Sequence, residues 1–211
     1  MGQMTVFSSN SHGRTSSSLL LRLRQDGQAR EVAWHEFYEL YSPIISGFAR
    51  RMGAQGEIVD DLVQEVMRAF FAASPEFSYD PARGRFRGYL KTCVTRKLSE
   101  MRAKIRPESG GLDASRVVAP ESADHSADAH WDDVWETEKL QRALAIVRER
   151  YAVNPERQRT FRAFEMCSLL DLSTDEVARQ LGISGESVRA AKSRVSKSLR
   201  QAFDDLDDVL G

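Results

Sequence analysis

The chain has few cysteines and no long apolar run. Two cysteines occur among its 211 residues. Cys93 and Cys167 lie in helical patterns without CxxC or Cys/His ligand spacing, so we expect small core residues rather than a redox or metal site. The leucines at 19–21 are followed at once by Arg22 and Arg24. This pattern predicts neither a signal peptide nor a membrane span and favours a cytoplasmic protein.

The chain also carries almost no net charge. The formal charge is −1, so no global basic excess indicates a nucleic-acid partner. The charges are nevertheless sorted along the chain: residues 83–106 hold nine cations and one acid, whereas residues 107–138 hold nine acids and one cation. A basic block followed by an acidic block indicates a patterned chain with local binding surfaces.

No combination of side chains predicts an enzyme. The sequence has neither a nucleophile–base pair nor a phosphate-binding glycine loop, so no catalytic residue and no cofactor are predicted. Asp60 and Asp61 fit the first turn of a helix, where the helix dipole favours acids. His125 and His130 stand near two aspartates, but their loose spacing does not predict a metal site.

Helical periodicity dominates the sequence and predicts an all-α fold. Residues 1–17 are rich in serine, glycine and asparagine and are expected to be disordered. We expect one small helical domain over residues 18–105 and a second over residues 132–206. Residues 106–131 lack apolar periodicity and are rich in acids, prolines and glycines, which predicts a flexible acidic linker.

Residues 173–203 predict a helix-turn-helix. Ser173 and Glu176 form a capping-box pattern at the start of one helix. Gly182 suits its left-handed end, and Ser184 can cap a second helix. The second helix carries an apolar stripe at steps of three and four residues: Val188, Ala191, Val195, Leu199 and Ala202. Its other faces carry five cations and no acid between Ser187 and Arg200.

A basic helix of this kind fits a DNA major groove, where phosphate contacts supply affinity and a few side chains near its start read bases. An ordinary helical hairpin with a solvated basic face is the alternative.

The segment 74–88 interleaves aromatic residues with arginines. Such a mixture suits single-stranded nucleic acid, because bases stack on the rings while the cations neutralise phosphates. An ordinary loop whose aromatic side chains fold back onto the core fits equally well. The following helix has hydroxyl and cationic side chains on its outer side that suit a DNA backbone; they include Lys91, Thr92, Thr95 and Arg96.

Three stretches together resemble a known family. These are DDLVQEVMRAFF at 60–71, FSYDPARGRFRGYLKT at 77–92, and the segment from Asn154 to Arg200 with its helix-turn-helix. In this order they are similar to ECF sigma factors, the small two-domain group of the sigma-70 family. The resemblance covers about residues 18–105 and 134–203. It implies a factor that binds core RNA polymerase and directs promoter recognition, DNA melting and transcription initiation.

The resemblance also implies sites. Polymerase would be bound by Asp61, Gln64, Glu65 and Arg68. The melted −10 element would be bound by Arg85, Phe86, Arg87, Tyr89, Lys91, Thr92, Thr95 and Arg96. The −35 element would be bound by Ser184, Ser187, Arg189, Lys192, Ser193, Arg194 and Lys197. Tyr89 stands where the family often has tryptophan, and Arg96 where asparagine is frequent.

Promoter DNA and core polymerase are thus the implied partners, and an anti-sigma factor is a further candidate. The acidic linker, or the acids at 204–208, could also regulate DNA binding in cis. The rival interpretation is a helix-turn-helix transcriptional regulator that needs no polymerase, and it would predict tight DNA binding by the chain alone.

Overall fold

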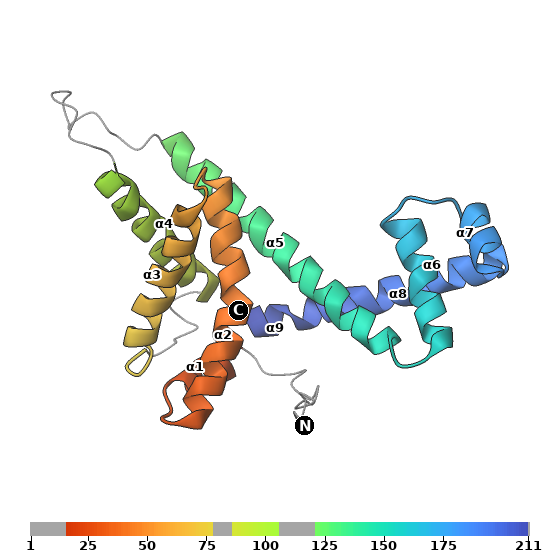
Figure 1. The fold of residues 1–211 in the computed structure, drawn as a ribbon, viewed down its shortest axis with the longest axis horizontal. Coiled ribbons are helices and arrows are strands. Elements are labelled where there is room, and N and C mark those ends of the chain that lie inside the picture. Colours follow the sequence, from red (N-terminus) through yellow and green to blue (C-terminus); the bar gives the residue numbers. More distant parts are fainter. Residues whose placement is uncertain (1–15, 78–85, 106–120, 211) are drawn as a thin grey trace, which may run out of the picture. The chain divides into compact units, whose positions relative to one another are not determined.

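The computed structural model describes residues 16–77, 86–105 and 121–210. Its elements are α1 (Ser16–Leu23), α2 (Gln28–Arg51), α3 (Glu57–Ala73), α4 (Phe86–Ile105), α5 (Glu121–Tyr151), α6 (Pro155–Ser168), α7 (Thr174–Leu181), α8 (Gly185–Asp205) and α9 (Asp207–Leu210), shown in Figure 1. No strand occurs in these ranges, so the predicted all-α class is confirmed. The N-terminus expected to be disordered lies outside them except for Ser16 and Ser17, which begin α1.

The chain forms two compact units. The first contains the described residues up to Trp135 together with those from Asp208 onward, and the second runs from Glu136 to Asp207. Each unit has its own apolar core, and the helix α5 contributes residues to both.

Aromatic rings join α2, α3 and α4 in the first unit. The rings of Phe37 on α2 and Phe70 on α3 stack with their centroids 4.5 Å apart. Phe86, the first residue of α4, packs edge-on against Tyr41 at 5.2 Å and Phe70 at 5.6 Å. Phe37, Tyr41 and Phe86 are all fully buried. Offset and edge-on ring pairs add directional stabilisation to the area that they bury, so they hold these three helices in one arrangement.

The first half of α5 belongs to this same core. Trp131 is 1% exposed, and its ring packs edge-on against Phe48 of α2 at 5.1 Å. Val134 is buried beside Gly47, where a Cβ atom would lie 2.9 Å from Val134 Cγ1. Gly47 therefore lets α2 and α5 approach more closely than any other residue would.

This arrangement differs from the linker expected over residues 106–131 and from a second domain beginning at residue 132. Residues 106–120 lie outside the described part, but residues 121–131 are helical. The reason is that Ala127, Trp131 and Val134 recur at helical spacing within the acid-rich stretch, and all three are buried. Their apolar stripe overrides the polar composition, because packing of one face is enough to stabilise a helix.

The second unit contains the predicted helix-turn-helix. Ala163, Met166 and Cys167 of α6 pack with Val177 of α7 and with α8 in one buried cluster. The capping box at Ser173 and Glu176 is present, with Ser173 N donating to Glu176 Oε2 at 2.9 Å. Gly182 ends α7 with φ 63°, a left-handed conformation that favours glycine. These local predictions are confirmed.

The capping box gives a first testable prediction. Replacing Ser173 with alanine should destabilise the second unit by about 1 kcal/mol at neutral pH, because amides at the start of α7 lose their acceptor. Ser173→Asp, which keeps an acceptor, and Ser168→Ala at the exposed end of α6 are the controls. Denaturant unfolding followed by circular dichroism measures the difference, and equal stability of Ser173→Ala and wild type would contradict the role of the cap.

The same box gives the sign of its pH dependence. Hydrogen bonds from Ser173 lower the pKa of Glu176 below its ordinary value of 4.5. A carboxyl group whose pKa is lower in the folded state stabilises the fold above its unfolded pKa. The part of the wild-type advantage over Ser173→Ala that comes from the hydrogen bond between the Ser173 hydroxyl and the Glu176 carboxylate should therefore be complete at neutral pH and be lost as the pH falls through the folded pKa, whereas the part that comes from the amide cap should remain.

Candidate nucleic-acid interface

The residues predicted to bind polymerase share one side of α3. Asp61, Gln64, Glu65 and Arg68 follow one another at steps of three, one and three residues, which places them on adjoining turns. Asp61, Gln64 and Arg68 are exposed, whereas Glu65 is partly buried. Glu65 forms ion pairs with Arg68 and with Lys97 of α4, the latter at 3.0 Å. The hydrogen bond from Lys97 lowers the pKa of Glu65, so its carboxylate stays charged and fixed in place.

Phe86 does not lie on the surface. It is 0% exposed and is enclosed by rings from α2 and α3, so its side chain is not available to stack on a base. Phe77 also turns inward, with its ring 5.4 Å from Phe70. For these two residues the structure supports the alternative in which the aromatic side chains fold back onto the core. Tyr79, Arg83 and Arg85 lie outside the described residues.

Tyr89 is the most exposed of the aromatic residues that the structure describes between residues 77 and 89. It is 39% exposed, and its ring lies 5.0 Å from Phe77 and 5.8 Å from Phe86. Partial burial, aided by a hydrogen bond with Cys93, raises the pKa of Tyr89 to about 12. The phenol is therefore neutral at physiological pH, and rings on one side hold it as a firm platform for stacking.

The other predicted −10 residues of α4 divide into two rows. Thr92 and Arg96 are exposed, and Arg96 forms an ion pair with Glu100 at 3.0 Å. Arg87 and Lys91 are less exposed and pair with Asp132 and Asp128 of α5. The partly buried Thr95 belongs to neither exposed row, and its hydroxyl oxygen is covered and lacks a hydrogen-bond partner.

The predicted −35 residues fall into two groups, the serines at the capped start of α8 and the exposed side chains along it. Ser184 caps the helix and accepts a hydrogen bond from Ser187 N at 3.1 Å. The remaining predicted residues of α8 are exposed: Arg189, Lys192, Ser193, Arg194 and Lys197. Among the described residues, none of the four cations in this group has an ion-pair partner. Their charges are thus available to phosphates.

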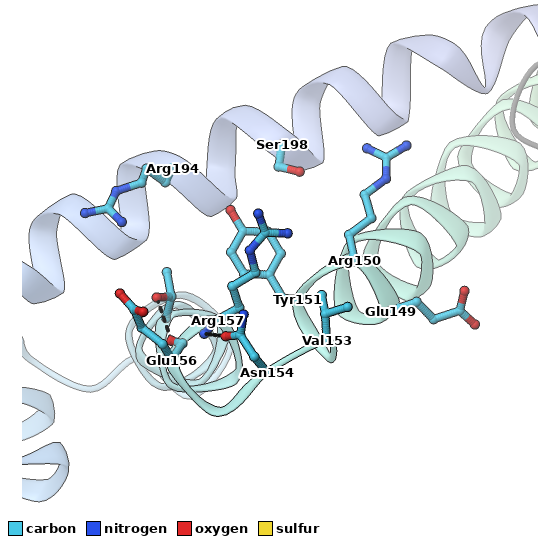
Figure 2. A pocket seen from close by; sticks show the side chains of 10 residues that line it. Glu149, Arg150, Tyr151, Val153, Asn154, Glu156, Arg157, Arg194 and Ser198 are labelled. Carbon is cyan, nitrogen blue, oxygen red and sulfur yellow. Dashed lines mark hydrogen bonds between the residues drawn. The ribbon is translucent and has the colours of Figure 1, made fainter.

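Sequence reasoning missed two further cations beside α8. A cleft of about 680 Å³ is lined by Arg150 at the end of α5, Arg157 of α6 and Arg194 of α8, with Tyr151 among them (Figure 2). All three arginines are exposed. The signal of Arg150 and Arg157 was weak because they stand outside the helix-turn-helix, and only the fold brings them to the same cleft as Arg194.

The acidic C-terminal segment has partners of its own. Asp207 pairs with Lys139 at 2.5 Å; Lys139 is 2% exposed, and its ammonium nitrogen lies 3.7 Å from the centre of the Phe203 ring. Asp205 accepts a hydrogen bond from Gln201 at 2.8 Å. A buried charge needs its partner, so Asp207 is held by Lys139 rather than by the outer cations of α8.

Within the ranges that the structure describes, no group of three or more His, Cys, Asp and Glu side chains could hold a metal ion. None of the described helices combines the length and apolar character needed to cross a membrane.

Comparison with known families identifies the two units. A family model described as sigma-70 region 2 matches residues 37–106, and one described as sigma-70, region 4 matches residues 155–199. Together these ranges cover more than half of the chain. A comparison with curated proteins found no match.

The matched regions define a transcription factor that takes part in promoter recognition. The chain belongs to the sigma-70 family and is a sigma factor of the ECF type. The region 2 match extends from within α2 to the end of α4, and the region 4 match covers α6, α7 and most of α8.

The exposed cations of α8 predict a strong dependence of DNA binding on salt. Replacing Lys192 and Lys197 with alanine should reduce the slope of log K against log salt by about 2, since each lost phosphate contact removes about 0.9. Fluorescence anisotropy with a labelled DNA duplex measures this slope. The control, Arg159→Ala with Arg162→Ala on α6, changes net charge equally, and an equal loss there would show that only overall charge matters.

The exposed ring of Tyr89 predicts a stacking contribution. Tyr89→Ala should weaken binding of a single-stranded oligonucleotide by about 1–3 kcal/mol, because stacking of one base on an aromatic ring is worth about this much. Tyr89→Phe should bind like wild type, since the ring is kept. Binding is measured by fluorescence quenching, and a loss in both variants would assign the effect to the hydroxyl group rather than to stacking.

Proposed function

We propose that this chain binds core RNA polymerase and directs it to promoters, where the first unit holds the −10 element as a single strand and the second unit reads the −35 element as a duplex. The observation that carries this proposal is the presence of both matched regions in one chain, with an exposed and unpaired row of cations along α8. The cytoplasm is the proposed location, because the polymerase acts there.

The helix α3 is the proposed polymerase-binding element. Asp61 and Gln64 present an acid and an amide side by side on its exposed face. Glu65 lies next to them and forms ion pairs with Arg68 and Lys97, which hold its carboxylate in a defined position. A fixed polar surface of this kind loses little conformational entropy on binding, which favours a specific contact.

For the −10 strand we propose a platform on α4. Tyr89 offers a ring for stacking, while Thr92 and Arg96 lie on an exposed row that suits phosphate contacts. Phe86 supports the platform from inside, packed 5.8 Å from Tyr89. Its proposed role is thus to hold Tyr89, and it replaces the direct contact with DNA expected from the sequence.

For the −35 duplex we propose that α8 enters the major groove. Arg189, Ser193 and Lys197 are exposed along it, and its capped N-terminus adds backbone amides that attract phosphate. Arg150 and Arg157 line the same cleft as Arg194 and add cations to this part of the second unit.

The two DNA-binding units act together when both are bound to polymerase. The second contact then becomes intramolecular and gains effective concentration, so neither unit needs to bind DNA tightly alone. Strand opening costs unstacking energy, which capture of extruded bases on Tyr89 offsets. The chain performs no bond chemistry in this scheme.

The rival function, a regulator that needs no polymerase, accounts for α6, α7 and α8 but leaves the region 2 match without a role. An anti-sigma factor is a further candidate partner.

A pull-down with purified core polymerase tests the proposal. The variant Asp61→Ala, Gln64→Ala, Glu65→Ala should bind at least about tenfold more weakly, because a few central residues carry most of an interface's affinity. The matched control is Gln25→Ala with Asp26→Ala and Glu31→Ala, which also removes one exposed amide and two exposed acids, in the turn before α2 and in its first turn. A folded wild-type chain that does not bind cognate core polymerase would favour the polymerase-independent regulator.

A further inference from the structure

An acidic row of α5 lies along a basic row of α4 within the first unit. Arg87 pairs with Asp132, and Lys91 pairs with Asp128. The residues stand four apart on each helix and pair in opposite order, so the two helices run antiparallel here. A third aspartate, Asp133, pairs with Arg51 of α2 at 2.6 Å. Three carboxylates of one short segment are thus matched to three cations.

Apolar contacts give the same segment a defined position. Trp131 and Val134 are buried against α2, beside Phe48 and Gly47. Trp135 is also buried, and the guanidinium group of Arg87 lies 5.0 Å from its ring centre. The ion pairs therefore do not form between two freely moving surfaces, because the rings fix which carboxylate meets which cation.

The paired cations belong to the face proposed to bind DNA. The side chain of Arg87 is 20% exposed and that of Lys91 is 29% exposed, whereas that of Arg96 is 81% exposed. Carboxylates and phosphates are both anionic oxygen ligands for the same guanidinium and ammonium groups. While Asp132 and Asp128 neutralise Arg87 and Lys91, these cations attract DNA phosphates less strongly.

We propose that the basic row of α4 is an interaction surface for which residues 126–135 of this chain and single-stranded DNA compete. Full engagement of the strand then requires that Asp128 and Asp132 of this segment release Lys91 and Arg87. The proposal rests on the proposed function and adds a regulation of the same site. The segment is tethered to α4 through residues 106–120, so it competes at the high effective concentration of an intramolecular ligand.

The test compares charge-neutralising variants of the full chain. Asp128→Asn with Asp132→Asn should bind a labelled single-stranded oligonucleotide of mixed sequence about three- to tenfold more tightly than wild type, the range expected for two partly exposed ion pairs. The difference should shrink with added salt. The matched control is Glu57→Gln with Asp60→Asn, two exposed acids of α3 that change the net charge equally.

Affinity of the double variant no higher than that of wild type, or no higher than that of the control, would overturn the proposal. Lower affinity together with lower thermal stability would show that the aspartates only support the fold, which also overturns it. Amide hydrogen exchange gives a second readout: exchange within residues 126–135 should rise when the oligonucleotide binds wild type, and unchanged exchange would contradict displacement.

The outcomes separate this inference from the proposed function. If the chain binds polymerase and single-stranded DNA but the aspartate variants behave like wild type, only the competition is wrong. If wild type and both variants bind no single strand even with core polymerase present, the proposed −10 contact and the competition fail together.

Discussion

The ring stack between Phe37 and Phe70 is the contact on which the first unit depends. It joins α2 to α3, and Phe86 closes the cluster from the start of α4. Because these residues fix the rotation of each helix, they also decide which side chains face outward. Asp61 and Gln64 on α3 and Tyr89 on α4 are exposed as a consequence. The candidate binding surfaces are thus the outward faces of α3 and α4, the helices whose inner faces form the aromatic core.

The second unit was the easier to predict, because its signals are local. Ser173, Glu176, Gly182 and Ser184 each specify a helix end through their own chemistry, and the apolar stripe of α8 sets its buried face. Phe86 could not be placed in this way. An aromatic residue next to a loop can face a base or a core, and only the partner rings from α2 and α3 decide between them. The start of α5 was missed because acids outnumber the apolar residues that anchor it.

The opposite charges that nearly cancel over the whole chain also meet one another in the folded structure. The basic block at 83–106 and the acidic block at 107–138 are separate in sequence, yet Arg87 and Lys91 meet Asp132 and Asp128 in space. Neutralisation on α4 contrasts with α8, whose outer cations have no ion-pair partner among the described residues. Of the two helices proposed to bind DNA, α4 therefore has counter-charges within the chain, whereas the outer cations of α8 remain available to a ligand.

A substitution at Gly47 would change the packing of the α5 segment without removing any charged group from the α4–α5 surface. A methyl group there would collide with Val134, whose β-branched side chain has little freedom to turn aside. Gly47 itself lies inside α2 and has no charge to exchange with DNA. An alanine at this position would thus act as a steric wedge that pushes the α5 segment away without removing any carboxylate or any cation of the surface.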